Sequence, residues 1–207
     1  MAIAARIDVK EKDLLGALRG FLRDILEIDY IKAILVAQHL PIKNMVMPTL
    51  VTDPDQLDGV DPLAPAFPLN AAKIVSRLTR KPTGAKIAAV MRPCEIRAFV
   101  ELVKLKQGQT DDVVLIGMDC LGAFQNKDYL QYAGEQGAES TMRFCKCVLD
   151  GNPEEIEGTA LPHLTFDACF AVKFFHNASH DGKPEAMAVD VDLVELREGP
   201  EKPYLFF

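Results

Sequence analysis

The chain has 207 residues, of which 49% are hydrophobic, and it carries a formal net charge of −7 with a pI of about 5.1. This size is enough for one large α/β domain, or for one domain with an appendage. The acidic balance and the lack of a basic stripe argue against nucleic acid as a main partner. No apolar run approaches the roughly 20 residues that cross a bilayer. The N-terminus carries charges before any apolar block, unlike a secretory signal, so we expect a cytoplasmic protein.

The first elements in chain order are a helix and two strands. Residues 11–28 place apolar side chains at helical spacing, which predicts an amphipathic helix. Residues 30–38 follow as an apolar run and predict a strand, and residues 44–51 predict a weaker one.

The next stretch predicts a long loop. Residues 52–70 are rich in proline and aspartate, residue types that interrupt regular structure. Loops of this length inside compact domains are usually functional or mobile. Asn70, at the end of the loop, can cap the helix predicted for residues 71–80.

Two later stretches share one design. In "KIAAVMRPCEIRAFVELVKLKQ" (residues 86–107) and "DVVLIGMDCLGAF" (residues 112–124), an apolar run ends close to a cysteine, Cys94 or Cys120. Strands that alternate with helices predict an α/β fold with a mainly parallel sheet and crossover helices. Because ligands of such sheets bind outside the carboxyl ends of the strands, we expect both thiols at one edge.

The pattern weakens after Gly134. Residues 139–151 fit either a short helix or a loop, while residues 167–175 and 185–198 predict strands. We therefore predict an α/β domain over residues 1–150 and a small β-rich C-terminal extension over residues 151–207.

The cysteines suggest a metal or redox site. Pro93 suits a first helical turn, so Cys94 is expected at a helix N-terminus with a lowered thiol pKa. Neighbouring strands lie about 4.8 Å apart, so the Cys94 and Cys120 sulfurs could share a metal centre. Cys145 and Cys147 supply two further thiols. Four scattered thiolates suit an iron–sulfur cluster or a structural zinc.

Plainer interpretations of the same residues stay open. A cysteine at one strand end is more often a small core residue than a ligand, and Cys169, within an apolar run, is assigned to the core. Glu95 is expected in a first helical turn from the helix dipole alone. Arg92 faces either an anionic ligand or solvent. A nucleophilic role for Cys94 would need a base in reach, and the sequence places no histidine near either strand end.

The segments "RPCEIR", "DCLG" and "VMPTLVTDP…DPLAPAFPLNAAKIVSRLT" carry a resemblance to a known family. Over about residues 31–149 the chain resembles the beta-subunit family of coenzyme F-420 hydrogenases and dehydrogenases, which includes formate dehydrogenase beta subunits. The resemblance implies an electron-transfer flavoprotein subunit of an oxidoreductase. Members carry a [4Fe–4S] cluster and FAD, and pass electrons between a partner's clusters and a hydride carrier such as coenzyme F-420.

The resemblance also implies site residues and partners. It assigns the cluster to Cys94, Cys120, Cys145 and Cys147. It places the flavin at the strand ends, beside Asn70, Arg92, Pro93 and Glu95. The partners would be a ferredoxin-like subunit, or the catalytic subunit of a hydrogenase or formate dehydrogenase. Because the cofactors carry the chemistry, no general acid or base is required.

The chain also departs from that family. It lacks the ferredoxin-like segment with Cys-x-x-Cys-x-x-Cys runs that many relatives carry, and the resemblance ends near Gly151. These departures support an alternative function. In that alternative the chain is a non-catalytic interaction or docking subunit with the same fold, whose cysteines are structural or bind zinc.

Overall fold

A computed structural model gives the structure of the chain. It describes residues 2–7, 9, 13–40, 45–81, 84–118 and 120–149, and the strand residues 159–160, 171–175 and 186–188. Within these ranges, no helix has both the length and the apolar character needed to cross a bilayer.

A seven-stranded sheet forms the centre of the described structure, in the order β3-β2-β4-β5-β8-β1-β9. Its strands are β1 (Ala2–Arg6), β2 (Ile31–His39), β3 (Val46–Val51), β4 (Lys86–Met91), β5 (Val113–Met118), β8 (Ala171–Phe175) and β9 (Ala186–Ala188). All of them run in one direction except β3 and β8, which are antiparallel to their neighbours. The predicted α/β fold with a mainly parallel sheet is confirmed.

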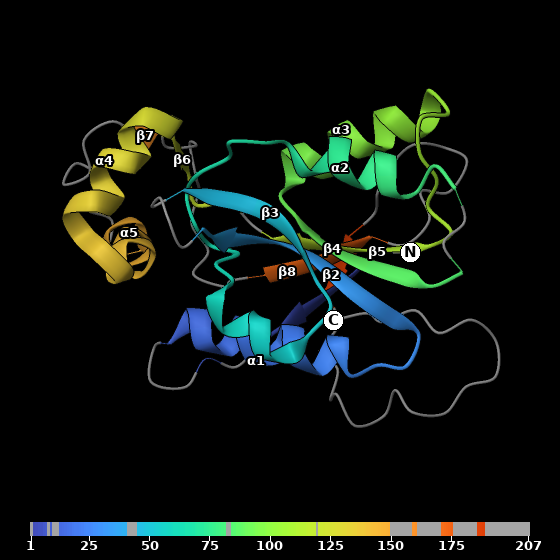
Figure 1. Cartoon of the computed structure of the whole chain (residues 1–207), viewed down its shortest axis with the longest axis horizontal. Coiled ribbons are helices and arrows are strands. Elements are labelled where there is room, and N and C mark those ends of the chain that lie inside the picture. The colour runs from blue at the N-terminus through green and yellow to red at the C-terminus, as the bar shows by residue number, and fades with distance from the viewer. Residues whose placement is uncertain are drawn as a thin grey trace.

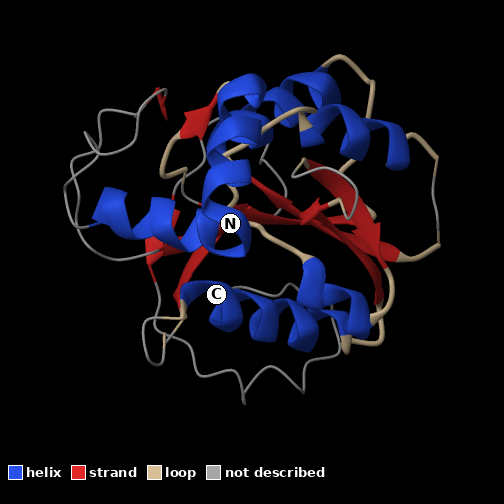
Figure 2. Cartoon of the chain, turned by 60° about the vertical axis from the view of Figure 1, so that its left-hand side comes forward, coloured by secondary structure: helices blue, strands red, loops and turns tan. Residues whose placement is uncertain are grey.

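Helices cover both faces of the sheet (Figures 1 and 2). Helix α1 (Leu14–Leu26) and the short 3-10 helix η2 (Pro54–Gly59) lie on one face, while α2 (Ala71–Leu78) and α3 (Pro93–Lys104) lie together on the other. The helix predicted for residues 11–28 is thus confirmed over its central part. It begins after Asp13, whose side chain accepts a hydrogen bond from the Gly16 N–H at 2.8 Å.

Successive side chains of a strand point to opposite faces of the sheet, so one sheet contributes to two hydrophobic clusters. On β2, Ile34 and Val36 pack in the cluster that contains the buried face of α1, whereas Leu35 packs with α2 and α3. On β5, Ile116 and Leu115 divide between the two clusters in the same way. Strands buried on both faces read as continuous apolar runs, which is why residues 86–91 and 113–118 carried a strong strand signal.

A third helical unit lies beyond one end of the sheet (Figure 1). It comprises β6 (Ala123–Phe124), α4 (Asn126–Gln136), the 3-10 turn η3 (Gly137–Glu139), α5 (Ser140–Leu149) and β7 (Thr159–Ala160). The chain reaches this unit from the carboxyl end of β5, so it stands against the carboxyl edge of the parallel strands. Helix α4 ends at Gly137, which has φ +65°, a conformation that glycine adopts without strain. We call α4 and α5 the helical cap.

The structure decides several open points of the sequence analysis. Residues 140–149 form a helix, not a loop, and the predicted loop of residues 52–70 contains η2. Strand β1 was not predicted. Strands β8 and β9 belong to the main sheet, with β1 between them. The division into domains at residue 150 stays a prediction, and Cys169 lies outside the described residues.

Candidate functional site

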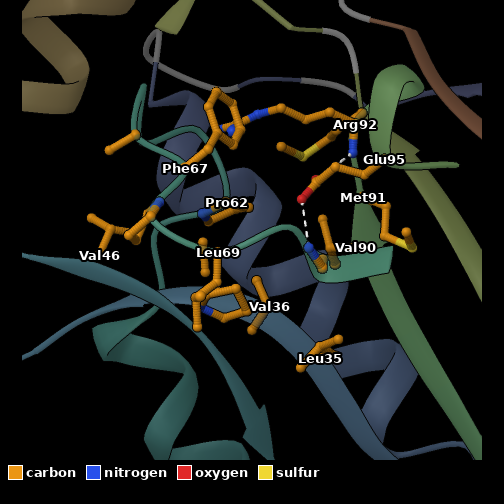
Figure 3. Close-up of a pocket in the computed structure, with 16 residues that line it drawn as sticks. Leu35, Val36, Val46, Pro62, Phe67, Leu69, Val90, Met91, Arg92 and Glu95 are labelled. Atoms are coloured by element: carbon orange, nitrogen blue, oxygen red, sulfur yellow. Dashed lines mark hydrogen bonds between the residues drawn. The ribbon is translucent and has the colours of Figure 1, made fainter. Parts of the chain in front are cut away.

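The carboxyl ends of β4 and β5 lead into a site centred on Arg92. Arg92 follows β4 directly and is the N-cap of α3, and it is only 7% exposed. Its guanidinium lies 3.0 Å from the centroid of the Phe67 ring (Figure 3). Its Nη2 donates to the Ala64 carbonyl. Burial lowers the pKa of Arg92 to about 10, against the opposing effect of nearby negative groups, Cys120 foremost. Arg92 therefore remains a buried cation at neutral pH.

Glu95 joins the starts of two helices. Its Oε1 accepts from the Ala71 N–H at 2.8 Å, at the start of α2, and its Oε2 accepts from the Arg92 N–H at 3.1 Å, at the start of α3. Asn70 completes the arrangement, because its side chain accepts from the Ala72 N–H at 2.9 Å. One buried carboxylate thus fills the anion position that the two helix N-termini create.

A pocket opens between the proline-rich loop and the sheet (Figure 3). Its volume is about 30 Å³, enough for one or two water molecules. The charged groups of the lining are Arg92 and Glu95. The other walls are mostly apolar and come from Leu35, Val36, Val46, Pro62, Phe67, Leu69, Val90, Met91 and Met118.

Two of the predicted metal ligands lie at this edge. Cys94 is exposed in the first turn of α3, next to the exposed Pro93, and Cys120 is half-buried after β5. The expected low pKa of Cys94 is wrong. Partial burial, followed by the charges of Glu95 and Cys120, raises the pKa of that thiol above its ordinary value. The helix start does not act as expected because Glu95 already supplies its negative charge.

The other two predicted ligands lie on α5 in the helical cap. Cys145 is 1% exposed and belongs to the apolar core, while Cys147 is half-buried. Burial, with a further contribution from the charge of Asp61, raises the pKa of Cys145 to about 12. Within the described part of the chain, no three side chains of Cys, His, Asp or Glu are close enough together to hold a metal ion. The four thiols are therefore not gathered into one ligand set.

Because the Cys145 thiol is buried, we expect the free energy of unfolding to fall in alkaline solution. The pKa of Cys145 rises from an ordinary 9.0 to about 12 on folding, so the folded chain holds this proton more tightly than the unfolded chain. Its contribution is complete below pH 9 and declines as pH rises toward 12, by up to about 1.4 kcal/mol per pH unit. Denaturant titrations between pH 8 and pH 10 should show a shallower decline for Cys145→Ala. Cys120→Ala is the matched control, and an equal decline in both variants would contradict the assignment.

The sequence analysis missed the residues that close the site. Asp61 and Phe67 come from the proline-rich loop, and His39 ends β2. Four aspartates lie between residues 52 and 70, and no local signal separates the buried Asp61 from its exposed neighbours. The length and composition of the loop indicated that it is either functional or mobile, and this is the only signal that points to these residues.

Comparison with known proteins gives a short similarity. No family model matches the chain. A stretch of 47 residues is 43% identical to part of the F420-dependent formate dehydrogenase 1 subunit beta of Methanococcus maripaludis. This stretch covers 23% of the present chain and 12% of that subunit. Over that stretch the chain is similar to a subunit of a redox enzyme.

Proposed function

We propose that this chain is an electron-transfer subunit of a redox complex, acting at the carboxyl edge of β4 and β5. The observation that carries the proposal is that Cys94 and Cys120 both follow the carboxyl ends of the neighbouring strands β4 and β5, where Arg92 is buried. The short similarity to a formate dehydrogenase beta subunit supports the same chemistry. In such proteins the cofactors carry the reaction, and the polypeptide sets their binding, orientation and potential.

The pocket is the proposed place for a flavin or for the deazaflavin coenzyme F-420. Its lining combines one buried guanidinium, one aromatic ring and apolar walls, but a volume of about 30 Å³ is too small for a planar conjugated ring, so a bound ring would require the proline-rich loop to shift. Arg92 and Phe67 are the residues that would hold the ring. Asn70 and Glu95 would act indirectly, by fixing the helix starts around it. When bound, such a ring supplies two-electron chemistry.

A [4Fe–4S] cluster is a separate part of the proposal. Cys94 and Cys120 would supply two of the four thiolates that such a cluster needs. The described arrangement does not fit a complete ligand set, because Cys145 is enclosed in the core. Ligation by Cys145 and Cys147 would require α5 to repack against the sheet edge.

The enclosed Cys145 favours a second candidate function. A thiol that packs in an apolar core behaves as a small hydrophobic residue. On this view the chain is a non-catalytic docking subunit of a redox complex, in which the α5 thiols are structural or bind zinc. The partner would be another subunit of that complex in either case.

Reconstitution separates the two functions. Protein purified without oxygen is loaded with iron, sulfide and FAD, and bound iron, zinc and flavin are measured with the visible spectrum. We expect bound FAD and about four irons per chain, with the iron lost in Cys94→Ser and Cys120→Ser. Cys169→Ser is the control, since Cys169 lies outside the predicted ligand set. Zinc without iron or flavin would refute the electron-transfer role and support the docking subunit.

The flavin site has its own variants. Phe67→Leu removes the ring beside Arg92 but keeps an apolar side chain, so FAD should bind roughly 10-fold more weakly. Lys104→Gln, on the exposed last turn of α3, is the control and should bind FAD like the unmodified chain. Equal FAD affinity in both variants would show that the flavin does not bind in this pocket.

A further inference from the structure

The pocket contains a buried positive charge that has no acidic partner. Arg92 is 7% exposed and lines the pocket. None of the ion pairs in the described part of the chain includes this residue. Buried charges in proteins are normally paired, because an unpaired charge is costly to remove from water. The position of Arg92 therefore points to a negatively charged ligand.

Two acids, Glu95 and Asp61, influence Arg92 without binding its guanidinium. Glu95 uses one carboxylate oxygen for the Ala71 N–H and the other for the backbone N–H of Arg92. Asp61 accepts from the Thr141 hydroxyl at 2.5 Å. The charges of both acids act on Arg92 through space, but neither carboxylate is within ion-pair distance of its guanidinium. These acids lower the net positive charge of the site and leave the guanidinium donors available.

The guanidinium keeps several donors that a ligand could use. An arginine side chain carries five N–H donors in one plane. Nη2 donates to the Ala64 carbonyl, and within the described residues the side chain has no other hydrogen-bond acceptor. The Phe67 ring lies against the guanidinium carbon, 3.0 Å from its centroid (Figure 3). A planar oxyanion suits the remaining donors, because a carboxylate can accept two parallel N–H bonds from a guanidinium.

The size of the pocket limits the ligand to a small one. Its volume is about 30 Å³, which admits one or two water molecules. Since each water takes up about 30 Å³ in the liquid, two waters fill roughly the space of an acetate ion. The walls next to the charged groups are mostly apolar and include Val36, Val90 and Met91. A carboxylate that carries a short apolar end therefore matches both parts of the lining.

From these observations we propose that the pocket beside Arg92 binds a free monocarboxylate of about the size of acetate. The carboxylate accepts from the guanidinium, and the short carbon end faces the apolar walls. This inference narrows the choice between an anionic ligand and solvent that the sequence left open for Arg92. It concerns the pocket with the proline-rich loop in its described position, and it does not rest on the electron-transfer role.

The test compares three small molecules that differ in charge and length. The full chain, without iron or flavin, is mixed with acetate, acetamide or hexanoate at constant ionic strength, and binding is measured by saturation-transfer-difference NMR. Acetate should give a saturable methyl signal. Acetamide has nearly the same shape but no charge, so it should bind at least about 10-fold more weakly. Hexanoate should also bind more weakly than acetate, because its longer chain exceeds the pocket.

A pair of arginine variants locates the binding site. Arg92→Lys keeps the positive charge but loses the planar donor arrangement, so acetate should bind about 10-fold more weakly. Arg97→Lys is the matched control, because Arg97 is exposed on the same helix, and its variant should bind acetate like the unmodified chain.

Three results would overturn the proposal. They are the absence of an acetate signal from the unmodified chain, equal acetate affinity in Arg92→Lys and Arg97→Lys, and tighter binding of hexanoate than of acetate. If Arg92→Lys does not fold, the comparison of the three molecules on the unmodified chain decides alone. Because the protein is tested without cofactors, a failure to bind FAD or iron would overturn the proposed function and leave this result standing.

Discussion

Replacing Glu95 with alanine should lower the free energy of unfolding by about 3 kcal/mol. The change leaves two buried N–H groups without an acceptor, and each unpaired group costs roughly 1–3 kcal/mol. These are the N–H groups of Ala71 and Arg92, at the starts of α2 and α3. Both N–H groups depend on this one carboxylate, which is only 7% exposed. Denaturant titration followed by circular dichroism measures the change.

Two further variants make the Glu95 experiment decisive. Glu95→Gln keeps the shape and one carbonyl acceptor, so it should lose about half as much stability as Glu95→Ala. Glu101→Ala removes an exposed carboxylate of the same helix, which pairs with Lys104 at 2.8 Å, and it should change stability little. If Glu95→Ala were as stable as Glu101→Ala, Glu95 would not join the two helix starts. It would then be open to contact with a cofactor.

Replacing Phe144 with alanine should destabilise the helical cap by about 4 kcal/mol, the usual loss for a buried phenylalanine. Phe144 is fully buried on α5, with its ring centroid 5.7 Å from that of Phe124. Phe124 in turn stacks on Tyr132 of α4 at 4.8 Å, so these rings pack the two cap helices against β6.

The Phe144 variant also tests whether the cap opens as a unit. Hydrogen exchange should rise first over α4 and α5, while β2, β4 and β5 keep their protection, because local units can open below the global free energy. Phe99→Ala is the control, since Phe99 is equally buried but packs between α3 and the other face of the sheet. Equal protection loss over the whole sheet in both variants would show that the cap and the sheet unfold together.

The helical cap is bonded to the proline-rich loop. The Thr141 hydroxyl donates to Asp61 across a separation of 80 residues. An opened cap would release Asp61 and expose Cys145 at the same time. Any cluster that uses Cys145 and Cys147 would therefore require the cap to open.

Local sequence patterns are enough to predict the elements of this protein that depend on neighbouring residues. The spacing of Leu18, Phe21, Leu22 and Ile25 predicts α1, and the apolar runs before Cys94 and Cys120 predict β4 and β5. The crossover pattern then brings both thiols to one sheet edge, because parallel strands share a direction. Those inferences needed only neighbouring residues along the chain.

The chemistry at the carboxyl edge of β4 and β5 depends on contacts between distant segments of the chain. Glu95 looked like a helix-dipole residue, yet it also accepts from the first residue of α2, 24 residues earlier in the chain. Cys145 looked like a ligand and is enclosed in the core, and Asp61 looked like a loop residue and is buried against His39 and Thr141. Burial and hydrogen bonding at these positions depend on segments that are distant in sequence, so no local periodicity records them.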